Sequence, residues 1–216
     1  MSEVVQDQLK RLEEIYYPDE RQEYFQNTLE DLHSKLRGII LSDAVPLDVR
    51  QLFETAKNIS LYSWFVYRFN QVAELVSFSA VEMALRIRYL RENPTVPESK
   101  ESPPTLFRLM QHAKSERWIT NGGFSGMYEL ARDHAECIKM MEKATTHDFD
   151  LEPSMLIDDP SEDEIQDALN NLDRVSAVAE NINKSRNNLA HGSSTLHPDS
   201  ISTLRINADI INQVYQ

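Results

Sequence analysis

The stretch SLYSWFVYRFNQVAELVSFSAVEMALRIRYLRE, residues 60–92, is the most apolar part of a chain of 216 residues. Its apolar side chains fall on nearly every face of a helix, a pattern typical of the buried central helix of a bundle. Polar residues interrupt the stretch, so no unbroken apolar run reaches the roughly 20 residues of a membrane span. The stretch therefore predicts an all-α fold built around one long helix from about Ser60 to Glu92.

The sequence on both sides also has helical periodicity, and no segment shows the alternation of a β-strand. Helices are expected over seven further segments, at residues 3–16, 20–41, 46–58, 105–116, 124–144, 160–192 and about 198–215. Ser161 and Glu164 have the spacing of a capping box at the start of the sixth of these segments. We place the domain boundary so that residues 1–58 form an N-terminal helical extension and residues 59–216 form a helical bundle.

The charge of the chain is strongly acidic and unevenly distributed. There are 22 Lys and Arg residues against 35 Asp and Glu residues, a formal net charge of −13, which argues against general binding of polyanions. Cationic side chains gather at Arg86, Arg88 and Arg91, with Lys184 further along the chain. A site for nucleic acid would have to be a local basic patch of this kind.

Cysteine content and the N-terminal sequence indicate a reducing compartment. Cys137 is the single cysteine, so no internal disulfide can form, and the charged N-terminus lacks the apolar core of a signal peptide. These features predict a cytoplasmic protein that does not enter a membrane. His134 and Cys137 are three residues apart, as metal ligands often are, but no second pair accompanies them. We therefore predict no metal site and no cofactor.

Aromatic residues are dense at Trp64, Phe65, Tyr67 and Phe69. Such a cluster is typical of a core or of a dimer contact, and it also suits a binding platform. The sequence alone leaves these alternatives open.

One motif near the end of the chain breaks the pattern of its own helix. The apolar stripe of the late helix runs through Ile165, Ala168, Leu172, Val175, Ala179 and Ile182. Leu189 continues this stripe, whereas Arg186 places a permanent charge where an aliphatic side chain is expected. Its charge must be paired, reach solvent along the side chain, or face a wet interface. Asn187 and His191 are four residues apart and share a helix face, so Asn187 can orient the imidazole. The alternative is that these residues only end the helix, because a His followed by Gly192 suits a helix C-terminus.

The segment RNNLAHG, residues 186–192, resembles the R-x4-H signature of the HEPN family (higher eukaryote and prokaryote nucleotide-binding domains). Arg186, the polar Asn187 and His191 match its three positions. The segment VSFSAVEMALRIRYL resembles the first core helix of that family, which carries a buried acidic residue. The resemblance covers roughly residues 60–216 and implies a HEPN-like helical bundle.

The resemblance implies a metal-independent endoribonuclease, a toxin or phage-defence effector, that acts as a homodimer with RNA as its substrate. His191 would be the general acid and base, Arg186 would clamp the phosphate, and Asn187 would position the reacting groups, with Asn188 in support. A further implied partner is an antitoxin or another protein. The alternative, from another class, is a non-catalytic interaction module that binds a partner protein or a nucleotide.

The chemistry of RNA cleavage favours the same dimer. Cleavage by the 2′-hydroxyl needs a base, an acid and positive charge, and a two-fold axis through the motif supplies two imidazoles and two guanidinium groups. Glu82 is expected to pair either with Arg186 across two helices or with Arg86 on its own helix. Four cations are predicted to contribute to RNA binding: Arg86, Arg88, Arg91 and Lys184.

Overall fold

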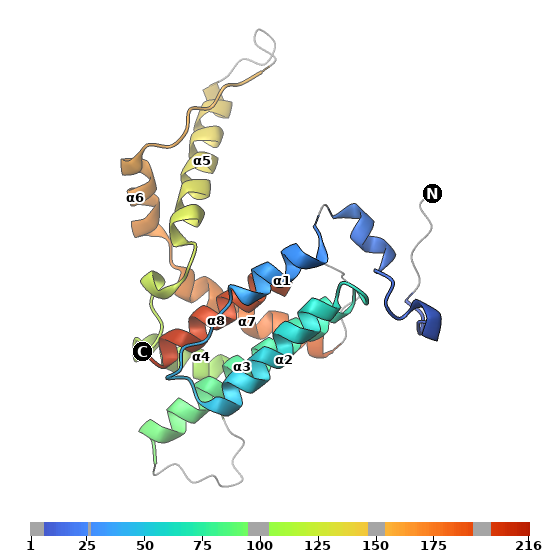
Figure 1. Cartoon of the computed structure of the whole chain (residues 1–216). Coiled ribbons are helices and arrows are strands. Elements are labelled where there is room, and N and C mark those ends of the chain that lie inside the picture. The colour runs from blue at the N-terminus through green and yellow to red at the C-terminus, as the bar shows by residue number, and fades with distance from the viewer. Residues whose placement is uncertain (1–6, 26, 95–103, 147–153, 192–199) are drawn as a thin grey trace.

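The computed structural model describes residues 7–25, 27–94, 104–146, 154–191 and 200–216, and these residues form helices and no strand (Figure 1). The all-α prediction is confirmed. The α-helices are α1 (Leu29–Arg37), α2 (Leu47–Tyr62), α3 (Phe69–Glu92), α4 (Leu106–Ser115), α5 (Met127–Thr146), α6 (Glu162–Asn171), α7 (Arg174–Ala190) and α8 (Ser200–Val214). Three short 3-10 turns accompany them: η1 (Leu12–Glu14), η2 (Glu20–Tyr24) and η3 (Asn121–Gly123).

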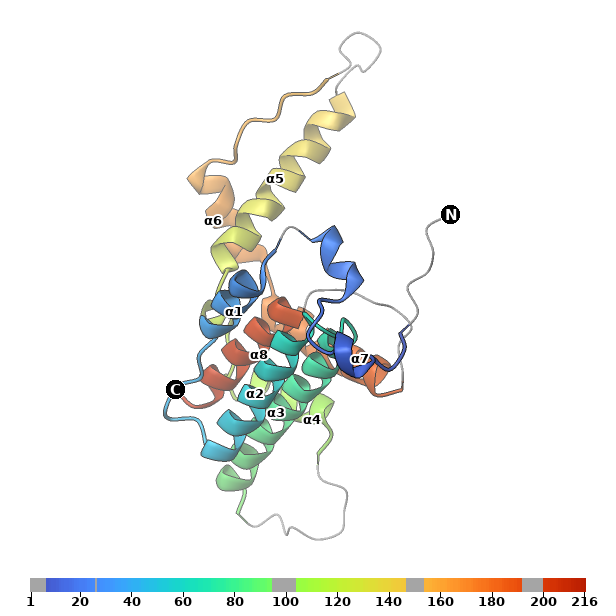
Figure 2. The ribbon, with the colours of Figure 1, turned by 45° about the vertical axis from the view of Figure 1, so that its right-hand side comes forward.

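Helix α3 is the centre of the bundle, packed against α2, α4, α7 and α8 (Figure 2). This placement confirms the role expected for the most apolar stretch. The prediction of one helix from Ser60 to Glu92 is nevertheless wrong, because α2 ends at Tyr62 and the chain turns before α3 begins at Phe69. The backbone N–H of Tyr67 in this turn donates to the carboxylate of Asp19, so a distant segment of the chain holds the turn in place.

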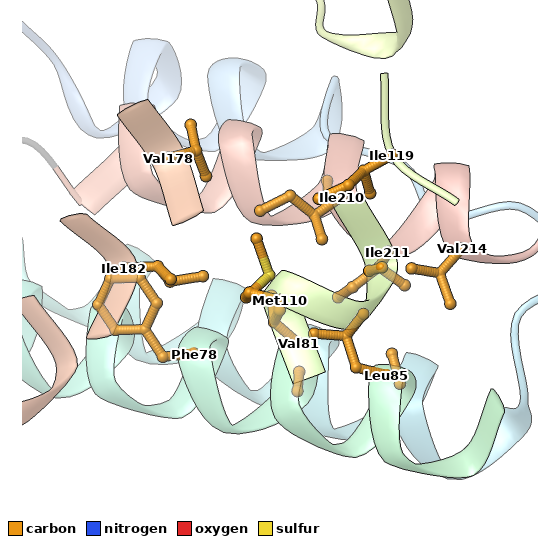
Figure 3. Close-up of a cluster of buried hydrophobic side chains, with 14 of the residues drawn as sticks. Phe78, Val81, Leu85, Met110, Ile119, Val178, Ile182, Ile210, Ile211 and Val214 are labelled. Carbon is orange, nitrogen blue, oxygen red and sulfur yellow. The ribbon is translucent and has the colours of Figure 1, made fainter. Parts of the chain in front are cut away.

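The core is one cluster of buried aliphatic and aromatic side chains between these helices. Figure 3 shows Phe78, Val81 and Leu85 of α3 facing Met110 of α4 and Ile210 of α8. Burial of each such side chain stabilises the fold by about 1.5–3 kcal/mol. Three fully buried residues of α2 belong to the same cluster: Val49, Phe53 and Ala56. The boundary predicted after residue 58 lies inside α2, so the second half of the N-terminal segment packs into the bundle itself.

The late helix predicted over residues 160–192 is two helices, α6 and α7, which is a second correction. The break falls at Leu172 and Asp173, where the Asp173 carboxylate accepts a hydrogen bond from the Ser176 N–H (2.9 Å) and caps α7. The side chain of Asn121 holds both sides of the break, by donating to the Leu172 carbonyl (2.9 Å) and accepting from the Val175 N–H (3.0 Å). The apolar stripe that was expected along one helix is therefore divided between α6 and α7.

Helices α5 and α6 form an arm that projects from the bundle (Figures 1 and 2). Its own small core consists of Ala131, Ala135, Ile165 and Ala168, which joins the first part of the divided stripe to α5. The capping box is confirmed, since Ser161 and Glu164 bond each other's backbone N–H groups. The second part of the stripe, in α7, packs in the main core.

The described residues from 7 to 25 depart most from expectation. Over the described part of residues 3–16 only the turn η1 is helical, and residues 20–41 form η2 and the short helix α1 in place of one long helix. Leu9 and Leu12 are 98% and 85% exposed, so their helical spacing meets no surface within the described part of the chain on which to pack. An amphipathic helix in water needs such a surface, because propensity alone rarely holds it.

Asp19 fastens this N-terminal arm, residues 7–25, to the bundle. Its backbone N–H donates to the Trp64 carbonyl (2.9 Å), and its buried carboxylate accepts from the Tyr67 N–H (3.0 Å) and from Nε of Arg21 (2.8 Å). Burial acts to raise the pKa of Asp19, but the hydrogen bonds from Arg21 and Tyr67 outweigh it, and the pKa lies below its ordinary value. The carboxylate is thus stabilised in its charged form.

Replacing Asp19 by asparagine is expected to lower the free energy of unfolding by about 1–3 kcal/mol at pH 7, because a buried charge-assisted contact is lost. Since the folded-state pKa is lowered, this stabilisation is complete above the ordinary carboxyl pKa of about 4 and is lost as the pH falls through the lowered value. Urea unfolding at neutral and acidic pH measures both effects. Asp43→Asn, at an exposed carboxylate paired with Arg50, is the matched control. An equal loss in the two variants at pH 7 would contradict the anchoring role.

Candidate functional site

A cleft of about 540 Å³ lies where α3, α7 and the start of α4 meet. Helix α3 contributes Glu82 and Arg86 to its lining, and residues 104–107 contribute another part of it. Helix α7 contributes Asn183, Arg186 and Asn187 from successive turns of one face. Two residues of the R-x4-H motif therefore open into a single cleft together with the acidic residue of the central helix.

Glu82 bridges the two arginines of the cleft. Its Oε1 accepts from Nη2 of Arg86 at 2.6 Å, and its Oε2 lies 3.7 Å from Nη2 of Arg186. Both partners predicted for Glu82 are thus present, one in a hydrogen bond and one in a looser ion pair. Two guanidinium groups face one carboxylate, so the cleft carries a local excess of positive charge.

Arg186 is held within its own chain, which accounts for a charge on the apolar stripe of α7. Its side chain is 40% exposed, and Nη1 donates to Oδ1 of Asn187 at 3.4 Å. The distance of 3.7 Å to Glu82 exceeds hydrogen-bond range, so Nη2 donates no hydrogen bond to another described residue. A cation oriented but incompletely bonded is well suited to grip a phosphate oxygen.

His191 ends α7 and is exposed. Its backbone N–H donates to the carbonyl of Asn187 (2.9 Å), which is ordinary helix termination. The expected side-chain hydrogen bond from Asn187 to the imidazole is absent, because Asn187 turns toward Arg186. The imidazole lies one turn beyond the cleft-lining Asn187, and Gly192 falls outside the described residues. The residues of the R-x4-H motif therefore also form the C-terminal end of α7.

The other cations predicted to bind RNA separate from Arg86. The Arg88 guanidinium lies 4.5 Å from the ring centre of Trp118 and also bonds Glu92 and the Val214 carbonyl. Arg91 and Lys184 are exposed and do not line the cleft, and neither does the exposed Asn188. Of the four predicted cations, only Arg86 reaches the cleft.

Two parts of the cleft were missed from the sequence. Asn183 precedes Arg186 by three residues and shares its helix face, so the spacing alone could have identified it. The start of α4, where the Thr105 hydroxyl accepts from the Arg108 N–H (3.4 Å), had no such signal, because its position depends on tertiary packing. The N-terminal end of the α4 dipole adds positive potential to this part of the cleft.

His134 and Cys137 both lie exposed on α5, and among the described residues no three His, Cys, Asp or Glu side chains gather closely enough to hold a metal ion. Every helix in this part of the chain is too short or too polar to cross a lipid bilayer.

Comparison of the chain with protein-family models, with curated proteins and with solved structures gives no match. The resemblance of RNNLAHG to the R-x4-H signature therefore stays a prediction, and the geometry of the cleft is the basis for any functional proposal.

Proposed function

We propose that this protein is a metal-independent endoribonuclease of the HEPN type, with its active site at the cleft of Arg186. The observation that carries the proposal is the meeting of Arg186, Asn187 and Glu82 in one cleft, with the exposed imidazole of His191 one turn further along the same helix. These groups match the needs of phosphodiester cleavage by an adjacent hydroxyl.

The proposed reaction is attack of the ribose 2′-hydroxyl oxygen on the neighbouring phosphorus. One imidazole takes the proton of the hydroxyl, a new P–O bond forms, and the P–O bond to the 5′ oxygen breaks as a protonated imidazole gives that oxygen a proton. The products are a 2′,3′-cyclic phosphate and a 5′-hydroxyl. Arg186 stabilises the additional negative charge on the phosphorane, and Asn187 orients Arg186 or the phosphate.

Two imidazoles are needed if the base and the acid are different groups, and one chain supplies one at this site. We propose a homodimer whose two-fold axis brings both motifs together. Light scattering at micromolar concentration is expected to give twice the chain mass of 25.0 kDa. A monomer under conditions in which RNA is cleaved would contradict the composite site.

Arg186→Ala is expected to slow RNA cleavage about 10²–10³-fold, the cost typical of losing one donor to a transition-state oxyanion. The cleavage rate of a labelled RNA in EDTA measures this effect. Arg205→Ala removes an exposed arginine from α8 and is the matched control. Equal rates for both variants would count against the proposed role of Arg186.

The cellular role follows from the activity. An endoribonuclease with access to host RNA would need restraint, which fits a toxin or a phage-defence effector acting in the cytoplasm with an antitoxin or another protein partner. Purification of the intact chain from its source, with identification of copurifying proteins, tests this part of the proposal.

A non-catalytic interaction module is the second candidate, favoured by the ion pair of Arg186 with Glu82 inside one chain and by the net charge of −13. In this case the role of Arg186 is to stabilise the packing of the helices. Arg186→Ala would then lower the stability of the fold while no RNA is cleaved by either form.

A further inference from the structure

A second pocket, distinct from the Arg186 cleft, lies where the N-terminal arm meets the bundle. It has a volume of about 250 Å³ and lies between the arm, α1 and the turn that joins α2 to α3. Three aromatic side chains line it: Phe25, Trp64 and Tyr67. The described residues of the proposed active site contribute nothing to it, so its function is independent of the proposed ribonuclease activity.

Contacts of the N-terminal arm, residues 7–25, hold the aromatic side chains of the pocket in place. The rings of Phe25 and Tyr67 are nearly parallel, at 15°, with centroids 6.1 Å apart, and the Arg21 guanidinium lies 4.8 Å from the ring centre of Tyr67. Asp19 bonds both Arg21 and the Tyr67 backbone, which orders this wall. A rigid aromatic wall of this kind favours planar ligands, because stacking on it costs little reorganisation.

The polar groups of the pocket complement a heterocyclic ring. Gln22 donates through Nε2 to the Ser63 carbonyl (3.2 Å), and Asn27 accepts through Oδ1 from the Lys35 ammonium (3.0 Å). Within the described part of the chain, Oε1 of Gln22 and Nδ2 of Asn27 have no hydrogen-bond partner. An acceptor and a donor at the edge of an aromatic pocket match the exocyclic and ring nitrogens of a nucleobase.

We infer that this pocket binds the base of a mononucleotide and that Lys35 pairs with its phosphate. A volume of 250 Å³ is small for a ligand site and accommodates one ring system, so the sugar and phosphate remain at the mouth. Lys35 is exposed on α1 beside Asn27, in reach of a phosphate there. The arm of residues 7–25 thereby has a function, since it supplies Gln22 and Phe25 and closes one side of the site.

Isothermal titration of the full chain with AMP tests the inference. Saturable binding is expected, adenosine is expected to bind about tenfold more weakly because it lacks the charged contact, and ribose 5-phosphate is expected not to bind. Lys35→Ala should weaken AMP binding about tenfold and leave adenosine binding unchanged. Phe25 lies outside the helices. Phe25→Leu should weaken the binding of both AMP and adenosine about tenfold or more, because base stacking is reduced.

Arg186→Ala separates this pocket from the cleft, because it should leave AMP binding unchanged. Absence of saturable AMP binding to the wild-type chain would overturn the inference. So would loss of binding in Arg186→Ala with retention in Lys35→Ala, since the nucleotide would then occupy the cleft. RNA cleavage is measured in a separate assay, so the inference and the proposed function can fail independently.

Discussion

Replacing His191 by alanine is expected to slow RNA cleavage about 10²–10⁴-fold, the range typical of losing a general acid or base. The variant should fold as the wild type does, because the imidazole is exposed and the helix keeps its backbone hydrogen bond from residue 191 to Asn187. Loss of activity without loss of stability is the signature of a catalytic group at this position.

The rate is measured on a labelled RNA in EDTA, beside thermal unfolding of both proteins. His134→Ala, which removes an exposed histidine from the projecting helix α5, is the matched control. Expression of the wild type should also arrest host growth, and His191→Ala should relieve the arrest. An unchanged cleavage rate in His191→Ala would remove His191 from the mechanism.

Replacing Phe53 by alanine is expected to lower the free energy of unfolding by about 3–5 kcal/mol. The side chain is fully buried in the main core although it lies within residues 1–58, which were predicted to be an extension. Truncation leaves a cavity between α2 and the bundle that the packed helices can fill only partly.

Urea unfolding monitored by circular dichroism measures this loss. Phe69→Ala removes the same ring from a position that is 37% exposed and should cost much less. If Phe53→Ala cost no more than Phe69→Ala, α2 would be peripheral to the stability of the fold, and the integral role assigned to it here would be wrong.

The central helix could be predicted because its apolar periodicity fits burial on several faces at once. The turn at residues 63–68 could not, because the apolar residues there suit a continuous helix equally well. Local backbone hydrogen bonds shape the turn, and Asp19 ties it down from 48 residues away through Tyr67 and also through Trp64; no local pattern reports such distant contacts.

The break in the late helix had a local signal that the stripe concealed. Asp173 and Ser176 have the spacing of a helix cap, but Leu172 and Val175 continue the apolar stripe across the break. The stripe favoured one helix because periodicity does not reveal that α6 and α7 pack on different partners. The same limit applies to the exposed apolar residues near the N-terminus. Helical spacing predicts that one face is apolar, but it does not predict which surface packs on that face.

Part of the candidate site could also be predicted from local sequence features. Arg186 stood out because a permanent charge interrupts an apolar stripe, and its pairing with Glu82 was one of two alternatives that helix geometry allows. The structure brings both alternatives together in one bridged carboxylate. The start of α4 joins the cleft only through tertiary packing, and for that reason the sequence gives no hint of it.

The most direct test of the central claim is incubation of a mixed RNA pool with the purified wild-type chain in EDTA, followed by analysis of the new RNA ends. Cleavage that leaves 2′,3′-cyclic phosphate and 5′-hydroxyl ends, and that disappears in Arg186→Ala and His191→Ala, is the predicted result. RNA that stays intact with the dimeric wild type, or cleavage that persists in both variants, would contradict a metal-independent active site at Arg186 and His191.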